Sequence, residues 1–421
     1  MASRSSAAYR WNILLLLTCS QTIAYIDRVN LSVVAPELIK LHGYSPALVG
    51  ILFSVFNWSY TVCFLFAGPI VDRARPRISY PVAVAVWSMA TALCSASVSF
   101  VSLAVCRAFV GLGEAPMIPS GARVIRDTYE PERRAIVVGS YFAGNKLGLA
   151  LGIPLSSVVL VSLGWQWVFY VTGALGATWL VWWLCVYRAP VQDGAGGHQA
   201  TNWTGWTTLL RHRTTWGLML GEAGYLYIYY VFATWLPGYL VIERHLSILK
   251  TGFVGSLPFL VGVGCTILGG WAADRLIARG HDVTLVRKGF AIGGLLAATV
   301  CTVAGALASQ TVLSIVLLTS SVASFSLATA NINAMSIDVA PRQFVSSLVG
   351  LQAFGGNVGG SFAPIITGLL VAATGSFETP LLVTAGVALV LGCGALGLIV
   401  GDLNCELRVT SDPAISARAD A

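Results

Sequence analysis

Long apolar stretches alternate with short polar segments along almost the whole chain. A helix needs roughly 18–25 mostly apolar residues to cross the hydrocarbon core of a bilayer. Twelve stretches meet this requirement, so the pattern predicts an all-α membrane protein. The predicted membrane-spanning helices cover residues 12–34, 47–70, 79–98, 101–121, 134–161, 165–187, 215–240, 250–273, 286–308, 311–334, 344–373 and 379–401.

One longer polar segment, residues 189–214, interrupts the series and contains the sequence QDGAGGHQATN. It lies between the sixth and the seventh predicted span. We interpret it as a cytoplasmic linker between two pseudo-symmetric six-helix halves. The predicted organisation is an N-terminal half (1–188), the linker (189–214), a C-terminal half (215–402) and a cytoplasmic tail (403–421).

The positions of the basic residues predict the orientation in the membrane, because cytoplasmic loops carry an excess of Lys and Arg. With the N-terminus in the cytoplasm, the cytoplasmic segments hold 19 of the 25 Lys and Arg residues. The outer loops then hold three, Lys40, Arg244 and Lys250, and the last three lie within predicted helices. We therefore expect a multi-pass protein of the inner cell membrane with both termini in the cytoplasm.

The composition supports a membrane protein and argues against a nucleic-acid partner. Charged residues make up 10% of the chain, against about 25% in soluble domains. The 44 glycines fit close helix packing in lipid. The net charge of +7 does not indicate nucleic-acid binding, since the basic residues recur between apolar stretches and form no continuous patch.

Cysteine and histidine give no sign of a metal centre or of an enzyme. Eight of the nine cysteines fall in apolar stretches and none forms a CxxC pair. We expect buried thiols, with no disulfide framework, metal site or cofactor. The five histidines lie in predicted loops, and neither HExxH nor GxSxG occurs. The first apolar run has no small-residue cleavage site, so it is predicted to be an uncleaved helix.

Short sequences repeat between the two predicted halves. GPIVDRARPR (68–77) and GGWAADRLIARG (269–280) both contain G-x-x-x-D-R, with the Asp–Arg pairs 202 residues apart. GNKLG (144–148) and GNVGG (356–360) are offset by 212 residues. Similar offsets in matching helices indicate a duplication. Duplicated halves of this kind place a substrate site near the middle of the membrane, between the halves.

The twelve predicted spans, the repeated loop motif and the central linker together resemble the major facilitator superfamily of transporters. In that superfamily the loop motif latches the cytoplasmic ends of helices and governs the conformational change. The resemblance implies this gating role for Gly68, Asp72, Arg73, Asp274 and Arg275.

A narrower resemblance, to the anion:cation symporter family, rests on four stretches. They are YIDRVNLSVVAPEL in the first predicted helix, FSVFNWSYTVCFLFAGPIVDR in the second, CRAFVGLGEAPMIPS in the fourth and YVFATWLPGYL in the seventh. The family includes bacterial galactonate, glucarate, hexuronate and phthalate-type permeases and animal sialic acid and glutamate carriers. The resemblance implies transport of an organic anion coupled to protons.

Asp27 and Arg28 lie side by side in the first predicted helix, where an ionisable residue is costly and marks a functional candidate. Arg28 presents a planar, permanently charged fork that matches a carboxylate; the alternative is that it reaches the membrane interface. Successive helical residues point about 100° apart, so the two side chains need not pair. Asp27 is either in a structural ion pair, with Arg107 or another helix, or a proton carrier. The resemblance implies substrate binding by Arg28 and proton coupling by Asp27.

Arg107 and Glu114 are seven residues, or two turns, apart in the fourth predicted helix and therefore face the same way. Pro116 and Pro119 permit a kink, which a membrane helix tolerates where it faces protein or a water-filled cavity. The resemblance implies that Glu114 accepts the coupling proton, with Arg107 as a charge partner. The alternative is a static salt bridge from Glu114 to Arg107 or Lys146.

Asn145, in the fifth predicted helix, stands where sugar-acid permeases commonly carry an amide that hydrogen-bonds substrate hydroxyls. Lys146, which follows it, departs from the pattern of the family. Three interpretations stay open for Lys146: a contact to a second substrate carboxylate, neutralisation of Glu114, or a lysine at a helix end. This residue bears on whether the substrate is a mono- or a dicarboxylate.

Tyrosines and amides complete the predicted site. Tyrosine hydroxyls hydrogen-bond polar substrates while the rings pack in apolar surroundings, although a stripe of tyrosines is also common in a core. Positions 352 and 357 lie about 140° apart on a helix, so we expect one of the two amides to line the cavity. Ala353 stands where galactonate-type carriers have Asn, which weakens a direct galactonate assignment. Glu222 is either a second titratable group or an interfacial charge. The further predicted substrate contacts are Tyr25, Tyr60, Tyr227, Tyr230, Gln352 and Asn357.

The sequence therefore predicts a transporter and not an enzyme. The leading hypothesis is a proton-coupled symporter that imports an organic carboxylate anion, a sugar acid or a related acid, by alternating access. Two alternatives stay open: a facilitator or exchanger of the same anions, and a permease for aromatic acids or dicarboxylates. The predicted partners are the organic anion, protons and the lipid bilayer, and we expect a monomer.

Overall fold

The structure, a computed structural model, describes residues 7–129, 131–188, 209–340 and 344–403, apart from the side chains of 68, 69, 72, 131–136 and 346. Every regular element in these ranges is a helix. The elements are α1 (Ala7–His42), α2 (Pro46–Cys94), α3 (Phe100–Glu114), α4 (Met117–Thr128), α5 (Pro131–Leu163), α6 (Trp165–Val186), α8 (Arg213–Ile242), α9 (Ile248–Ala278), α10 (Val283–Leu307), α11 (Thr311–Val339), α12 (Val345–Thr374), α13 (Glu378–Val387) and the π-helix η1 (Ala388–Ile399).

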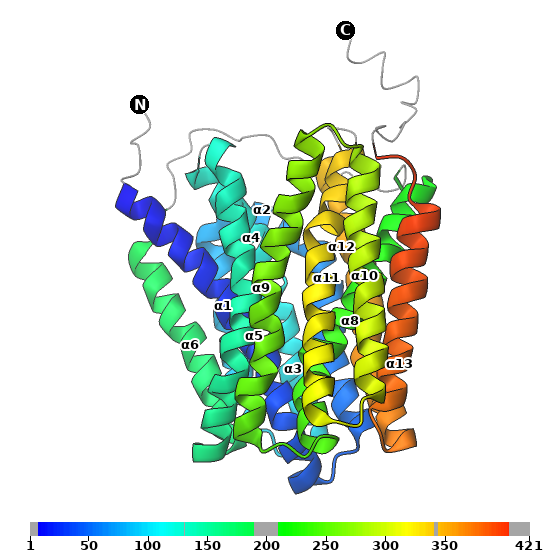
Figure 1. Ribbon diagram of the computed structural model, residues 1–421. Coiled ribbons are helices and arrows are strands. Elements are labelled where there is room, and N and C mark those ends of the chain that lie inside the picture. Colours follow the sequence, from blue (N-terminus) through cyan, green and yellow to red (C-terminus); the bar gives the residue numbers. More distant parts are fainter. Residues whose placement is uncertain (1–6, 130, 189–208, 341–343, 404–421) are drawn as a thin grey trace.

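The helices lie side by side along one common direction, which confirms the predicted all-α architecture (Figure 1). The described residues contain eleven helical segments that are long and apolar enough to cross a membrane. α1 is a further helix of 36 residues that runs the same way and carries Asp27 and Arg28 inside its apolar run.

Three elements differ from the predicted spans in a way that follows from local sequence. α2 holds two antiparallel spans, Pro46–Ala67 and Arg73–Cys94, which are joined at Arg75 in a left-handed conformation with φ 58°. The fourth predicted span is divided into α3 and α4, because the helix is interrupted between Glu114 and Met117 at Pro116. The last predicted span is α13 continued by η1.

The two ends of the bundle are distinct. α1 begins and η1 ends at the top of Figure 1, and we call this the terminal end. The opposite end, where α1 finishes at His42 and α2 begins at Pro46, is the distal end. The predicted linker falls largely on residues 189–208, and the predicted tail on 404–421, which lie outside the described residues.

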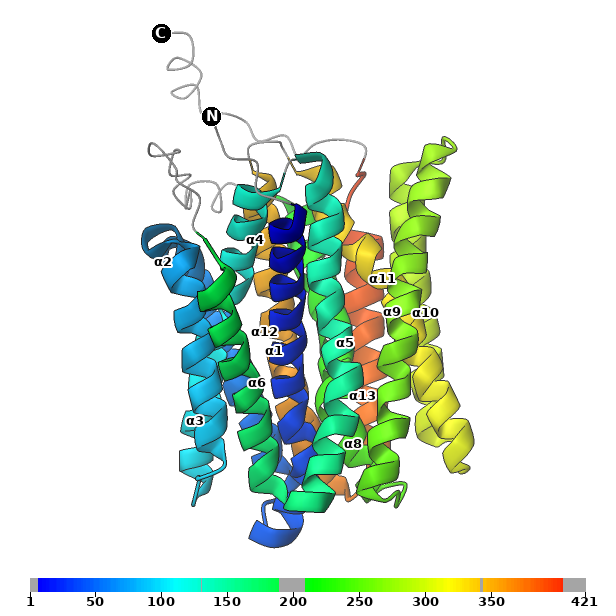
Figure 2. The ribbon, with the colours of Figure 1, turned by 90° about the vertical axis from the view of Figure 1, so that its left-hand side faces the viewer.

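Helices before residue 188 meet helices after residue 209 along three seams. α2 packs against α12, α5 against α9 and α1 against α8, and Figure 2 shows α5 beside α9. Glycines permit this approach near the distal end. A Cβ added to Gly50 would lie 2.6 Å from the carbonyl oxygen of Pro364, and one added to Gly252 would lie 2.7 Å from the Cβ of Ser157.

Apolar and polar side chains are distributed as in a protein that is surrounded by lipid. Large apolar side chains such as Val62, Leu184 and Ile267 are more than half exposed, whereas Asp27 and Glu114 are fully buried. Lipid covers the outer apolar faces, so the polar groups gather between the helices. The site is therefore to be sought inside the bundle.

Candidate functional site

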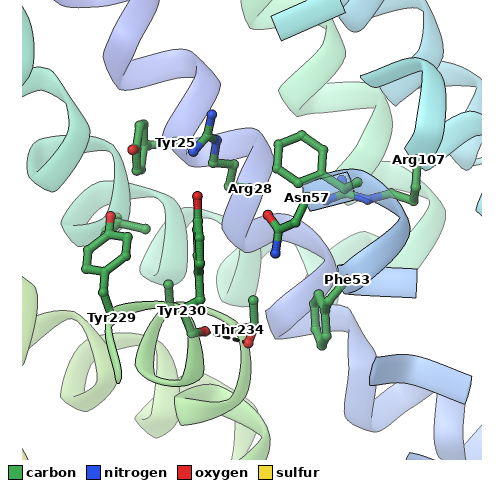
Figure 3. A pocket seen from close by; sticks show the side chains of 11 residues that line it. Tyr25, Arg28, Phe53, Asn57, Arg107, Tyr229, Tyr230 and Thr234 are labelled. Atoms are coloured by element: carbon green, nitrogen blue, oxygen red, sulfur yellow. Dashed lines mark hydrogen bonds between the residues drawn. The ribbon is translucent and has the colours of Figure 1, made fainter. Parts of the chain in front are cut away.

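A cavity lies inside the bundle at the level of Arg28, where five helices meet. Figure 3 shows Arg28 and Arg107 on one side of it and Tyr229, Tyr230 and Thr234 of α8 on the other. The free space, measured for the centre of a water molecule, is about 20 Å³. The lining residues are Tyr25 and Arg28 of α1, Phe53, Phe56 and Asn57 of α2, Arg107 of α3, Leu149 of α5, and Tyr229, Tyr230, Ala233 and Thr234 of α8.

Arg28 and Glu114 form an ion pair at this cavity. Nε of Arg28 donates to Oε2 of Glu114 at 2.8 Å, and Nη2 of Arg28 lies 2.8 Å from the same oxygen. Glu114 is fully buried and the Arg28 side chain is 10% exposed. Glu114 is the last residue of α3, directly before the interruption at Pro116. The partner of Glu114 is therefore Arg28, and neither Arg107 nor Lys146 makes an ion pair with it in the described part of the chain.

Aromatic rings surround the Arg28 guanidinium. Its Cζ lies 4.5 Å from the ring centroid of Tyr25, 4.9 Å from that of Tyr60 and 5.2 Å from that of Phe56. The faces of such rings attract a cation, and the attraction grows where water is excluded. The rings and Glu114 together hold Arg28 inside the bundle, so its side chain lies in the cavity instead of reaching the interface.

Arg107 approaches the same ring system from α3. Its Cζ lies 5.0 Å from the Phe56 centroid, so Phe56 contacts both guanidinium groups. Nη1 of Arg107 donates to the backbone carbonyl oxygen of Asp27 at 3.4 Å, and the residue is 1% exposed. The expected shared orientation of Arg107 and Glu114 agrees with this arrangement, since both reach α1 next to Asp27 and Arg28.

Asp27 points away from Arg28, as the spacing along the helix allows. Its Oδ1 accepts a hydrogen bond from Asn30 at 3.5 Å, and Asn30 also donates to Thr172 of α6 at 3.0 Å. Asp27 is fully buried and its Oδ2 has no hydrogen-bond partner among the described residues. A buried carboxylate that forms no ion pair is costly to keep ionised.

The cavity wall opposite Arg28 comes from α8 and connects to α12. The hydroxyl of Tyr230 donates to Oδ1 of Asn357 at 3.0 Å. Gln352, one turn and a half earlier in α12, instead donates to Glu222 at 3.2 Å and to the carbonyl oxygen of Ile332 at 3.0 Å. The two amides thus have different partners, and it is Asn357 that contacts a lining residue. Tyr227 is buried but does not line the cavity.

Lys146 reaches across the seam between α5 and α9. Its ammonium donates to the carbonyl oxygen of Gly262 at 3.1 Å and to the hydroxyl of Thr266. Lys146 lies near the middle of α5 and not at a helix end. The neighbouring Asn145 has a buried side-chain oxygen without a partner in the described residues. Leu149, one turn further along α5, lines the cavity.

Several lining residues escaped the sequence analysis. Phe53, Phe56 and Asn57 lie at positions that, with Tyr60, form one face of a helix, but phenylalanines inside an apolar stretch give no functional signal. Asn57 is a polar residue within a span, a signal that was present and not used. Thr234 is a common residue type in membrane helices, and nothing in its sequence neighbourhood marks it.

Contacts between helices separate the cavity from the distal end of the bundle. Ser32 donates to the carbonyl oxygen of Thr234 at 2.5 Å, which joins α1 to α8. Ser54 donates to the carbonyl oxygen of Ser361 at 3.0 Å, which joins α2 to α12. The rings of Phe53 and Trp235 meet edge to face at 5.6 Å. Phe53 and Thr234 are therefore both lining residues and parts of the closed end.

The repeated Asp–Arg motif is described in its second copy. Oδ1 of Asp274 lies 3.0 Å from Nη1 of Arg287, whose Nε donates to Asp338 at 3.1 Å. This ion-pair cluster joins α9, α10 and α11 near the terminal end. Arg275 stacks on Trp271 at 5.4 Å. In the first copy the side chains of Gly68 and Asp72 lie outside the described residues, and Arg73 is exposed.

Comparison with known proteins decides the family. The model of the Major Facilitator Superfamily matches residues 17–286. The chain belongs to the Major Facilitator Superfamily. It is 31% identical to the D-galactonate transporter of Escherichia coli O6:H1, over 94% of this chain and 96% of that protein. It is 28% identical to a probable galactarate/D-glucarate transporter of Bacillus subtilis, over 94% of this chain and 91% of that one.

Solved structures of two other transport proteins share the fold. A bacterial homolog of the human lysosomal transporter Spinster, inward-facing and unoccupied, has a TM-score of 0.80 at 19% identity and covers 93% of this chain and 97% of that one. A D-xylose–proton symporter has a TM-score of 0.78 at 13% identity, over 95% of this chain and 100% of that one.

Family membership confirms several predictions. The protein is a multi-pass membrane transporter of the Major Facilitator Superfamily and not an enzyme. The predicted resemblance to galactonate, glucarate and hexuronate carriers is confirmed, because transporters with these names are among its relatives.

Proposed function

We propose that this protein is a proton-coupled symporter that imports an organic carboxylate anion, a sugar acid or a related acid, by alternating access. The observation that carries the proposal is the ion pair between Arg28 and Glu114 at a buried cavity. Relatives named galactonate and galactarate/D-glucarate transporters support the substrate class.

Glu114 and a substrate carboxylate compete for the same donors. Nε and Nη2 of Arg28 both lie 2.8 Å from Oε2 of Glu114, and a substrate carboxylate needs such a paired donor set. A proton on Glu114 removes its charge and releases Arg28. Proton and anion then bind cooperatively, and the coupling free energy acts equally in both directions.

Asp27 is the second proposed proton site. Its unpaired Oδ2 leaves room for a proton, and its backbone carbonyl oxygen accepts from Arg107. A change in the charge of Asp27 acts on Arg107 at short range, because Arg107 donates to the backbone carbonyl oxygen of the same residue and both are buried. In this scheme Arg107 balances the charge of the carboxyl groups and does not bind the substrate.

Uncharged groups select the body of the substrate. The hydroxyl groups of Tyr25, Tyr60 and Tyr230 and the amides of Asn145 and Asn357 can donate to and accept from the hydroxyls of a sugar acid. Tyr227 and Gln352 stay predicted contacts, although each would have to turn from its present surroundings. The free space of about 20 Å³ holds water but not a sugar acid, so the cavity widens before the substrate enters.

The transport cycle follows from the closed distal end. With both termini cytoplasmic and the distal end outside, the contacts of Ser32, Ser54 and Trp235 close the outer side. The two proposed halves, 1–188 and 215–402, rock about the central site, and Asp274, Arg275 and the equivalent first-copy motif of Gly68, Asp72 and Arg73 govern the inner side. We place the protein in the inner membrane as a monomer.

Proteoliposomes test the proposed function directly. Wild-type protein should accumulate labelled D-galactonate or galactarate when a proton gradient is imposed. Glu114→Gln should lose this accumulation and keep exchange of labelled for unlabelled substrate, because the neutral amide leaves Arg28 available. Accumulation that ignores the proton gradient would contradict symport and favour a facilitator or exchanger, and failure to take up any sugar acid would contradict the substrate class.

A further inference from the structure

Lys146 is a buried cation whose partners are uncharged. Its ammonium crosses from α5 to α9 and donates to the carbonyl oxygen of Gly262 and to the hydroxyl of Thr266. No carboxylate forms an ion pair with it in the described parts of the chain. Arg28, by contrast, has Glu114, whereas Arg107, which like Lys146 forms no ion pair in the described residues, donates to the backbone carbonyl oxygen of Asp27.

The two acceptors compensate this charge poorly. An ammonium has three N–H donors, and its two partners are a backbone carbonyl oxygen and a hydroxyl. The carbonyl oxygen of Gly262 already accepts from the Thr266 hydroxyl at 3.0 Å, so this acceptor is shared between two donors. A cation taken out of water is stabilised far better by an anion than by neutral groups.

Lys146 lies within reach of the cavity. It is one turn from the lining residue Leu149, on the same side of α5. The opposite face of α5, at Gly148, lies against α1: a Cβ there would come within 2.5 Å of the Cβ of Tyr25. The Tyr25 ring stacks on Arg28. The flexible four-carbon stem of lysine can therefore turn from α9 toward the ligand that Arg28 holds.

We propose that Lys146 is a second anion anchor, which makes the preferred substrate a dianion: an acid with a carboxylate at each end of a hydroxylated chain. One carboxylate binds Arg28 and the other binds Lys146. This inference rests on the proposed function, which by itself requires one carboxylate alone.

The second carboxylate also acts on the α5–α9 seam. When Lys146 turns to the substrate it leaves Gly262 and Thr266, which are its contacts across the seam. A dianion thus loosens one connection between α5 and α9, whereas a monoanion leaves it in place. Binding and release of the dianion are in this way linked to the relative movement of the two helices.

The test compares two ligands that differ in one carboxylate. Galactarate carries a carboxylate where D-galactonate has a terminal CH2OH, and the affinity of the purified full-length protein for each is measured by isothermal titration. The wild type should bind galactarate about tenfold more tightly, as one charge-assisted contact predicts. Lys146→Met should remove this preference for galactarate and change the galactonate affinity by less than about twofold. Lys146→Arg should keep the preference. Lys250→Met, the same change at an exposed lysine, is the matched control and should behave as the wild type.

The ratio of the galactarate affinity to the galactonate affinity is measured within each variant, so a loss of folded protein does not imitate the effect. Lys146→Gln provides a second neutral variant. A wild type without a preference for galactarate, or a Lys146→Met variant that weakens both ligands equally, would overturn the proposal and leave Lys146 a purely structural link. In either case proton-driven uptake of galactonate would keep the proposed function intact. If neither acid binds, the proposed function itself fails.

Discussion

The similar stretches GNKLG (144–148) of α5 and GNVGG (356–360) of α12 carry different chemistry. α5 packs against α9 and α12 packs against α2. In the second stretch Asn357 accepts a hydrogen bond from Tyr230 and is followed by valine. In the first, Asn145 has an unpartnered buried oxygen and is followed by the cation Lys146.

The same difference extends to the whole cavity. The helices before residue 188 supply the charged groups Asp27, Arg28, Arg107 and Glu114. The helices after residue 209 supply tyrosines, Thr234 and, through Tyr230, an amide. In the proposed scheme the first region therefore binds the anion and handles protons, while the second contributes uncharged contacts to the substrate and to the closed distal end.

The largest effect is expected from Arg28, because it is the lining cation that the proposed scheme assigns to the substrate carboxylate. Arg28→Met should weaken binding of galactonate and of galactarate by about 100-fold or more, since two charge-assisted hydrogen bonds are lost. Isothermal titration measures this loss. Arg279→Met, which removes an exposed arginine near the terminal end, is the control. An equal loss of affinity in both variants would contradict the assignment of anion binding to Arg28.

A smaller effect is expected in the second region. Tyr230→Phe removes a hydroxyl that bonds to Asn357 and borders the cavity. It should weaken sugar-acid binding by about fivefold, the value of one neutral hydrogen bond, with no change in the number of protons transported per anion. A change in that number, measured by simultaneous flux of proton and labelled substrate, would place proton handling in the second region as well.

The smallest effect is expected from Glu222, the buried carboxyl of the second region. It receives a hydrogen bond from Gln352 and does not line the cavity. Glu222→Gln should keep proton-driven accumulation within about twofold of the wild type, because an amide replaces a carboxyl whose partner is itself neutral. Loss of accumulation comparable with that of Glu114→Gln would show that both regions carry protons.

Hydropathy predicted the existence of the helices better than their ends. The first span was predicted at 12–34, whereas α1 extends over Ala7–His42, because a helix continues into polar surroundings where apolar composition no longer marks it. The reversal between the second and third spans was predicted, but not its tight form, in which the helical hydrogen bonding resumes directly after the single left-handed residue Arg75.

For the site, the sequence predicted which charged residues take part but not how they pair. Asp27, Arg28, Arg107 and Glu114 stand out because charges are rare in apolar stretches, and the structure brings all four together. Their pairing did not follow from the sequence: the Arg28–Glu114 contact depends on how α1 and α3 are rotated against each other. That rotation is set by packing over many residues and leaves no mark at the two positions themselves.

The competition between Glu114 and the substrate for Arg28 is the central claim, and the pH dependence of binding tests it most directly. Galactonate affinity is measured from pH 5 to pH 9 for the wild type and for Glu114→Gln. For the wild type, the account predicts an affinity that falls with rising pH, by up to about tenfold per unit for one linked proton. For Glu114→Gln it predicts an affinity that stays high and changes much less over this range. A Glu114→Gln variant that keeps the full pH dependence of the wild type would contradict the account.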